Sequence, residues 1–224
     1  SLLSLVVSTG AHAIDMSAVL SSHVEYNNNI GSSSDSKFEE VIQKLSLDMG
    51  VQEGGKNFQA DANFRVLKEH YYNNSFSDKT SLAAGFGVFN FNIIESFLSW
   101  ETSFSRTELL IDTAEIDTPD NRTHRTIFRS GPSISYKLLR TSNLGLSANY
   151  TNVENSDENA SDSERMDGGL SFFHALNRVT ELTLTGSYGE SIDADEGDEY
   201  SSVNFNAGFV RRFSKGVFQF NYGR

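Results

Sequence analysis

Two stretches that alternate apolar and polar residues, and the short turn between them, decide the fold. They are Leu45-Ser46-Leu47-Asp48-Met49-Gly50-Val51-Gln52, then Glu53-Gly54-Gly55-Lys56, then Phe58-Gln59-Ala60-Asp61-Ala62-Asn63-Phe64-Arg65-Val66. Successive side chains of a strand point to opposite faces, so a period of two gives each strand one apolar and one polar face. A helix would repeat every 3.6 residues, and neither stretch fits that period. The sequence therefore predicts a β-hairpin here.

The same alternation continues along the chain and predicts eleven strands. We expect them at residues 18–27, 38–52, 58–66, 80–90, 96–105, 123–136, 143–152, 165–174, 180–188, 200–213 and 217–223. Short connections at 53–56, 91–95, 137–142, 175–179 and 214–216 alternate strictly with long ones at 28–37, 70–79, 106–122, 153–164 and 189–199. Turns on one side and loops on the other predict an all-β, antiparallel, up-and-down transmembrane β-barrel.

Composition agrees with one membrane-embedded β domain. The 224 residues contain no Cys, which excludes disulfides and thiolate metal sites. No apolar run approaches the roughly 18 residues that a membrane-spanning helix needs, so any crossing must use strands. Bacterial barrels have an even number of strands and end on an aromatic residue, whereas this sequence ends Tyr222-Gly223-Arg224. We therefore expect an incomplete barrel, truncated at its C-terminus, from a wall of about 12 to 16 strands.

The first residues resemble the remainder of a secretory signal peptide. Residues 2–7 are an apolar run, and Ala11-His12-Ala13 has the small-x-small pattern of a cleavage site. We expect residues 1–13 to be residual signal peptide and 14–224 to be the barrel domain in the outer membrane of a Gram-negative bacterium. The alternative is that residues 2–7 form a first buried strand and that the protein is cytosolic.

Aromatic residues gather near the two ends of the predicted strands. Tyrosines lie beside long loops and phenylalanines beside short turns, which is typical of the two aromatic girdles of a membrane barrel. The girdle residues that we expect are Tyr26, Tyr71, Tyr150, Tyr188, Tyr200, Phe89, Phe91, Phe172, Phe213 and Phe218. Strand ends of other β proteins also carry aromatic residues, so the girdles remain one of two interpretations.

Charged residues on the strands are expected to face the lumen. A Lys or Arg that faces lipid at mid-membrane costs about 2–4 kcal/mol. The candidate pore-lining residues are Lys44, Asp48, Asp61, Arg65, Glu101, Arg125, Arg129, Arg165, Asp167 and Glu181. Mixed charges of this kind either pair across strands and fill a narrow lumen or line a wet pore. The sequence leaves both possibilities open.

The long loops are acidic, and the net charge of the chain is −12. We therefore expect no nucleic-acid partner, because phosphate contacts need a basic surface, which acidic loops do not offer. Divalent cations are the more plausible partners of loops 106–122, 153–164 and 189–199. Residues 193–198 have the composition of a calcium loop without the spacing of an EF-hand, so solvated loops are the leading interpretation and no metal ligands are assigned.

No catalytic or cofactor motif is present. The histidines His23, His70, His124 and His174 lie in no metalloprotease pattern, and Gly85-Phe86-Gly87 fits a curved strand better than a phosphate cradle. We expect no enzyme and no cofactor. A barrel-embedded hydrolase with a Ser–His pair stays possible by spatial convergence.

Two short motifs carry a family resemblance. They are Val24-Glu25-Tyr26-Asn27-Asn28-Asn29-Ile30, with Asn28 where the family has Asp in Tyr-x-Asp-Asn-Ile, and Arg129-Ser130-Gly131-Pro132 with Tyr136; Trp100 in mid-strand also fits. With these motifs, residues 14–224 resemble Gram-negative outer-membrane β-barrels, and are similar to the porin-like proteins of exopolysaccharide and PEP-CTERM export systems. The resemblance implies a barrel in contact with outer-membrane lipid and lipopolysaccharide, without a catalytic site.

These observations lead to one expected function and two alternatives. We expect a porin-like barrel that passes small polar solutes or has a structural, export-associated role in the envelope. One alternative is a soluble β-sandwich or adhesin whose acidic loops bind a ligand, and the other is the hydrolase.

Overall fold

The chain folds into strands joined by hairpins. The computed structural model describes residues 5–9, 14–30, 39–112, 118, 121–157, 160–193 and 197–223. The strands are β1 (Leu5–Thr9), β2 (Ile14–Asn27), β3 (Glu40–Gly54), β4 (Phe58–Tyr71), β5 (Lys79–Ile94), β6 (Leu98–Leu110), β7 (Arg122–Leu139), β8 (Ser142–Asn155), β9 (Ser163–Asn177), β10 (Thr180–Asp193), β11 (Glu199–Phe213) and β12 (Gly216–Gly223). None of the described residues forms a helix that is long and apolar enough to cross a membrane.

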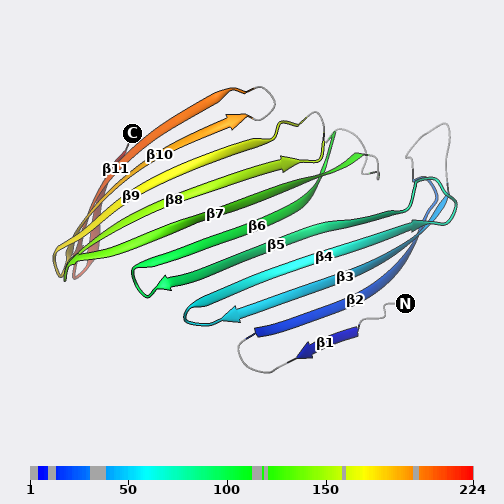
Figure 1. Cartoon of the computed structure of the whole chain (residues 1–224), viewed down its shortest axis with the longest axis horizontal. Coiled ribbons are helices and arrows are strands. Elements are labelled where there is room, and N and C mark those ends of the chain that lie inside the picture. Colours follow the sequence, from blue (N-terminus) through cyan, green and yellow to red (C-terminus); the bar gives the residue numbers. More distant parts are fainter. Residues whose placement is uncertain are drawn as a thin grey trace. The chain divides into compact units, whose positions relative to one another are not determined.

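The strands follow one another in a single antiparallel sheet, in the order β1 to β12 (Figure 1). This confirms the predicted all-β, up-and-down fold, and each of the eleven predicted strands is present as β2 to β12. A sandwich would need a second sheet packed on the first, so the described strands do not have that architecture.

A short strand precedes the eleven predicted ones. Leu5–Thr9, which lie within the predicted signal peptide, form β1, which pairs with residues 16–20 of β2. The signal peptide and its cleavage stay a prediction. The predicted cleavage site at residues 11–13 lies outside the described residues.

Several strands extend further toward the long connections than the sequence predicts. The clearest case is β6, which continues to Leu110, so Glu108 is a strand residue rather than part of an acidic loop. Similarly, β10 continues to Asp193. Backbone pairing continues past the last apolar residue, and alternation alone does not report that extension.

Two compact units divide the chain. Unit 1 comprises residues 1–89, 103–127 and 154–160, and unit 2 comprises residues 90–102, 128–153 and 161–224. The central strands β5, β6 and β7 contribute to both units, whereas β2 to β4 belong to unit 1 and β9 to β12 to unit 2.

In unit 1 the register brings like residues together. Apolar rows across β2, β3 and β4 are Leu20/Leu47/Val66, Ala18/Met49/Phe64 and Met16/Val51/Ala62. The rows on the other face are mainly polar, with Val19 and Leu67 as apolar members: His23/Lys44/Glu69, Ser21/Ser46/Leu67, Val19/Asp48/Arg65, Ser17/Gly50/Asn63 and Asp15/Gln52/Asp61. A slip of one residue would mix these rows, so the register creates one apolar and one polar face.

Unit 2 repeats this division. Its apolar rows across β8, β9, β10 and β11 are Leu144/Phe172/Leu184/Ala207, Leu146/Leu170/Gly186/Phe205 and Ala148/Gly168/Tyr188/Val203. Its polar rows are Gly145/Ser171/Thr185/Asn206, Ser147/Gly169/Ser187/Asn204 and Asn149/Asp167/Gly189/Ser202.

Large apolar side chains are exposed rather than gathered in a core. Met16, Leu170, Val203, Phe205 and Phe220 are each at least half exposed. The buried apolar cluster is small: Ile30, Ile42 and Tyr71, with Phe76 packed against them, all near the long connections. A soluble domain of this size buries many such side chains, so the apolar face is suited to an apolar partner.

One close approach in unit 2 depends on a glycine. A Cβ added at Gly131 would lie 1.9 Å from the carbonyl oxygen of Ala148, whereas at Gly168 nothing would lie within 4 Å. We expect Gly131→Ala to force β7 and β8 apart and to lower the free energy of unfolding by about 1–3 kcal/mol or more, as overpacking does. Gly168→Ala is the matched control and should leave it nearly unchanged. Urea unfolding in a micelle measures both, and equal effects would contradict the predicted contact.

Candidate functional site

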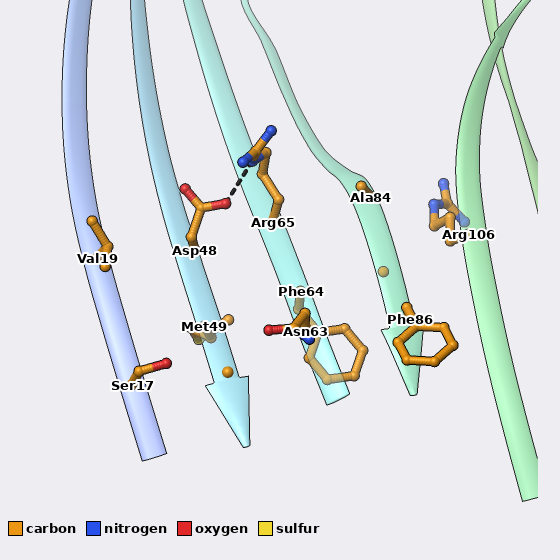
Figure 2. Close-up of a pocket in the computed structure, with 12 residues that line it drawn as sticks. Ser17, Val19, Asp48, Met49, Asn63, Phe64, Arg65, Ala84, Phe86 and Arg106 are labelled. Atoms are coloured by element: carbon orange, nitrogen blue, oxygen red, sulfur yellow. Dashed lines mark hydrogen bonds and ion pairs between the residues drawn. The ribbon is translucent and has the colours of Figure 1, made fainter. Parts of the chain in front are cut away.

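A hollow in unit 1 collects polar groups from the polar face. It measures about 510 Å³ and is lined by Ser17 and Val19 of β2, Asp48, Met49 and Gly50 of β3, Asn63, Phe64 and Arg65 of β4, Ala84, Gly85 and Phe86 of β5, and Arg106 of β6 (Figure 2). The alternation of β2 to β4 explains why Ser17, Asp48 and Arg65 meet here. Phe86 adds a ring that is 46% exposed.

Charges in this hollow are partly neutralised. The guanidinium of Arg65 donates from Nε to Asp48 Oδ1 on the neighbouring strand. Arg106 donates from Nε to the carbonyl oxygen of Leu82, 3.0 Å away, and from Nη1 to Thr126 Oγ1, 3.2 Å away. Both arginines are thereby held in fixed positions, and Arg65 remains more than half exposed. The hollow can therefore contact a polar solute through oriented donors.

Further toward the long connections, a chain of ion pairs crosses unit 1. Lys44 Nζ lies 3.1 Å from Glu25 and 3.8 Å from Glu69. Arg122 Nη1 lies 3.6 Å from Glu69 and 3.5 Å from Glu108.

His124 Nε2 lies at the end of this chain, 3.4 Å from Glu108, and makes an ion pair there only when the ring is protonated. Glu69 and His124 are buried, so these groups fill their part of the polar face.

The predicted pore-lining residues are only partly brought together. Lys44, Asp48, Asp61 and Arg65 share the polar face of unit 1. In unit 2 Arg165 forms a bidentate pair with Asp167, and Arg212 donates to Glu181. Glu101, Arg125 and Arg129 are exposed, and no ion pair to them is seen among the described residues.

Sequence reasoning missed Glu25, Glu69, Arg122 and His124 as members of the ion-pair chain. Alternation could have found two of them, because Glu25 follows His23 and Glu69 follows Arg65 on the polar face. Arg122 reaches Glu69 from β7, which is three strands away in the sheet order. No sequence pattern reports that contact.

The predicted girdle residues divide into three groups. Tyr188 and Phe172 lie in apolar rows, Tyr150 shares a row with Met166, Glu190 and Ser201, and Tyr26 continues the apolar face of β2. Phe213 and Phe218 are exposed, as is Phe91, and Phe89 is half-buried.

Two tyrosines need correction. Tyr71 is 2% exposed and packs in the apolar cluster of unit 1, because it pairs with Ile42 on the polar face; its neighbour Tyr72 is the exposed ring. Tyr200 lies in the row of Thr151, Arg165 and Ser191, which is polar.

A buried carboxylate fastens the connection between β4 and β5. Glu40, with 0% of its surface exposed, accepts hydrogen bonds from the backbone N–H groups of Val41, Asn73 and Ser75 at 2.8–3.0 Å. Asn73 Nδ2 also donates to the carbonyl oxygen of Glu39. Asn74 adopts a positive φ of 57°, which Asn tolerates better than most residues. These hydrogen bonds fix the conformation of the connection at residues 72–78, which we call the rim.

Asp78 closes the same connection. Its Oδ2 lies 2.6 Å from His70 Nδ1, and its Oδ1 accepts from the backbone N–H of Tyr71 at 3.1 Å. Two hydrogen bonds hold the pKa of the Asp78 carboxyl below its usual value, and the bond to His70 has a larger effect than the bond to the Tyr71 N–H. Asp78 is therefore a carboxylate at neutral pH.

Unit 2 contains a Ser–His pair. Ser142 Oγ lies 2.7 Å from His174 Nδ1, directly across β8 and β9. Ser142 is only 5% exposed, and His174 is half-buried. Among the described residues no group of three His, Asp or Glu side chains is placed to hold a metal ion. Residues 194–196 of the suggested calcium loop lie outside the described part.

Comparison with known proteins adds no identification. No family model matches the chain, and no curated protein is significantly similar to it. The geometry of the two faces is therefore the basis for any functional inference.

Glu40 is the side chain whose loss we expect to disturb the rim most. In Glu40→Gln an amide replaces an ionised acceptor, and its NH2 group becomes a buried donor facing other donors. The free energy of unfolding should fall by about 1–3 kcal/mol. Limited proteolysis within residues 72–78 should accelerate. Glu39→Gln, which alters the exposed neighbouring residue, is the control. Equal rates of proteolysis in the two variants would show that Glu40 does not hold this connection in place.

Proposed function

We propose that this chain forms the wall of a porin-like outer-membrane β-barrel through which small polar solutes pass passively. The observation that supports this most is the register-aligned division of β2 to β4 and of β8 to β11 into an apolar and a polar face, with large apolar side chains exposed. In the proposal the apolar face contacts lipid and the polar face lines the passage.

The spacing of aromatic residues in unit 2 supports a membrane. Val203, the register partner of Tyr188, and Phe213 lie on the same strand and ten residues apart. At about 3.3 Å per residue this is roughly 33 Å along the strand, or about 25 Å after a tilt of about 40°. That height equals the apolar band expected between two girdles. Arg211 lies over the ring of Phe213 at 5.2 Å, as a basic residue does at a membrane boundary.

The residues on the polar faces suggest which class of solute passes through the proposed barrel. Unit 1 offers the hollow with Arg65 and Arg106, whereas the polar rows of unit 2 consist mainly of Ser, Thr, Asn and Gly. Most charged side chains on the polar faces are paired with a side chain of opposite charge. The lining therefore offers hydrogen-bonding groups to a solute and only a weak net electrostatic potential. Such a lining favours small, polar solutes over strongly charged ones.

A structural, export-associated role is the second candidate. The ion-pair chain from Glu25 to His124 fills the polar face of unit 1 near the long connections, and its members Glu69 and His124 are buried. A wall whose mouth is filled in this way would conduct poorly while still anchoring a partner in the envelope.

The discriminating experiment uses the full-length protein. Reconstituted protein should migrate faster on gels before boiling than after it, and planar bilayers should show stepwise conductance. Heat-sensitive migration without conductance would favour the structural role. Migration that does not change on boiling would refute the barrel. N-terminal sequencing of the membrane-extracted protein tests the proposed cleavage after Ala13.

Adjacent residues on opposite faces test the assignment of the faces. Phe64 lies in the apolar row of Ala18 and Met49, and its ring lies 6.3 Å from that of Phe104, whereas Asn63 lies in the row of Ser17 and Gly50 on the other face. We expect Phe64→Arg to cost about 2–4 kcal/mol of membrane stability and to reduce the fraction of heat-modifiable protein. Asn63→Arg should assemble normally and change conductance instead. Equal assembly defects would show that the faces are assigned wrongly.

A further inference from the structure

One end of unit 2 is basic. The short turns of three hairpins lie there, and with the adjacent strand ends they span residues 137–143 between β7 and β8, 175–181 between β9 and β10, and 211–217 between β11 and β12 (Figure 1). These three segments, which we call the basic turns, contain six basic residues and one acidic residue: Lys137, Arg140, Arg178, Arg211, Arg212 and Lys215, with Glu181. At the opposite end, residues 161–167 and 188–199 contain nine acidic residues and one basic residue. The two ends of unit 2 therefore attract partners of opposite charge.

Backbone hydrogen bonds hold the basic turns side by side. The N–H of Ala175 donates to the carbonyl oxygen of Thr141 at 2.8 Å, and the N–H of Arg212 donates to the carbonyl oxygen of Val179 at 2.7 Å. Neighbouring strands of a sheet lie about 4.8 Å apart, so adjacent turns are about 10 Å apart. Each turn contributes one basic residue to a row along the end of the sheet, and the row consists of Arg140, Arg178 and Lys215.

Most charges of the basic turns have no counter-ion within the protein. Arg212 donates to Glu181 on the polar face. The other five side chains are exposed, and no ion pair to them is seen among the described residues of unit 2: Lys137, Arg140, Arg178, Arg211 and Lys215. Like charges that lie this close repel one another, so an anionic partner stabilises the basic turns.

The position of Arg211 indicates which kind of anion binds. Arg211 lies on the apolar face, because alternate residues of β11 share one face and Phe205 and Phe209 belong to it. Its guanidinium lies 5.2 Å from the centre of the Phe213 ring, and its register partner Phe218 meets Phe209 edge to face. The rings of Phe213 and Phe218 are more than half exposed. This surface therefore offers a cation and apolar area to the same partner.

The boundary between lipid chains and headgroups fits this arrangement. Under the proposed function, on which this inference rests, the apolar face contacts lipid and the short turns face the periplasm, where the leaflet consists of phospholipid. A basic side chain on the lipid face costs little near the interface, and its aliphatic stem lies along apolar surface while its charge reaches the headgroups. A soluble acidic partner would contact the turns and leave Arg211 and the phenylalanine rings uncovered.

We propose that the basic turns bind the phosphate groups of anionic phospholipids in the periplasmic leaflet. Arg211 binds a phosphate at the outer wall, Arg178 and Lys215 bind headgroups at the adjacent turns, and acyl chains lie over the Phe213 and Phe218 rings. Basic residues beside a membrane attract anionic lipids in this way. A headgroup that also carries an ammonium group brings a positive charge to the basic turns and binds less.

The test uses the full-length protein in phosphatidylcholine nanodiscs, with a guest lipid titrated in and retained lipid counted by native mass spectrometry. Phosphatidylglycerol should be retained at least tenfold more than phosphatidylethanolamine. Arg211→Gln and Lys215→Gln should each lower this preference about fivefold, as expected for one basic residue near an anionic surface. Lys68→Gln, which removes an exposed charge near the long connections, is the matched control and should leave the preference unchanged.

Three other outcomes overturn the inference. Equal retention of the two guest lipids shows that the charge of the headgroup is not recognised. An equal loss of preference in Lys68→Gln shows that any exposed lysine has this effect. Competition by soluble glycerol phosphate at the affinity of the lipid shows that the phenylalanine rings contribute nothing. Normal heat-modifiability and conductance beside any of these results leave the proposed function intact, whereas failure to insert refutes the proposed function and this inference with it.

Discussion

The coupling of backbone register to side-chain alternation is the constraint on which this structure depends. Leu47 pairs with Val66, Met49 with Phe64 and Asp48 with Arg65, so the register partners in the middle of β3 and β4 are mostly residues of the same kind. A slip of one residue would place Arg65 in an apolar row and Phe64 in a polar one. The polar hollow, the ion-pair chain and the exposed apolar face all follow from this register.

At the ends of the strands near the long connections, apolar residues also occur on the polar face. Ile42 and Tyr71 are apolar residues on the polar face, and with Ile30 and Phe76 they form the small buried cluster of unit 1. The Glu40 carboxylate and Asp78 then bind the backbone of residues 71–75. The connection at residues 72–78 is therefore stabilised by burial and by charge-assisted hydrogen bonds together.

The two units present different chemistry on the same kind of scaffold. Unit 1 carries paired Lys, Arg, Asp and Glu on its polar face, whereas unit 2 carries mainly hydroxyl, amide and glycine positions. Buried ion pairs contribute little net stability, since desolvation offsets their attraction. The Asp48–Arg65 pair is exposed, and its consequence is positional, since it orients the guanidinium of Arg65. Arg106 is oriented by its hydrogen bonds to Leu82 and Thr126. The register of the strands thus serves the proposed passage more than it serves stability.

Alternation and connection lengths by themselves determined the strands, their order and the face of residues such as Asp48, Asp61 and Arg65, because a period of two is a local property. Tertiary structure alone decided the contacts between strands distant in sequence. Arg122 of β7 reaches Glu69 of β4, Tyr71 is buried rather than at a girdle, and Tyr200 faces the polar side. It also decided that Leu5–Thr9 pair as a strand. Strand ends and side-chain reach depend on neighbours in space, which the local pattern does not specify.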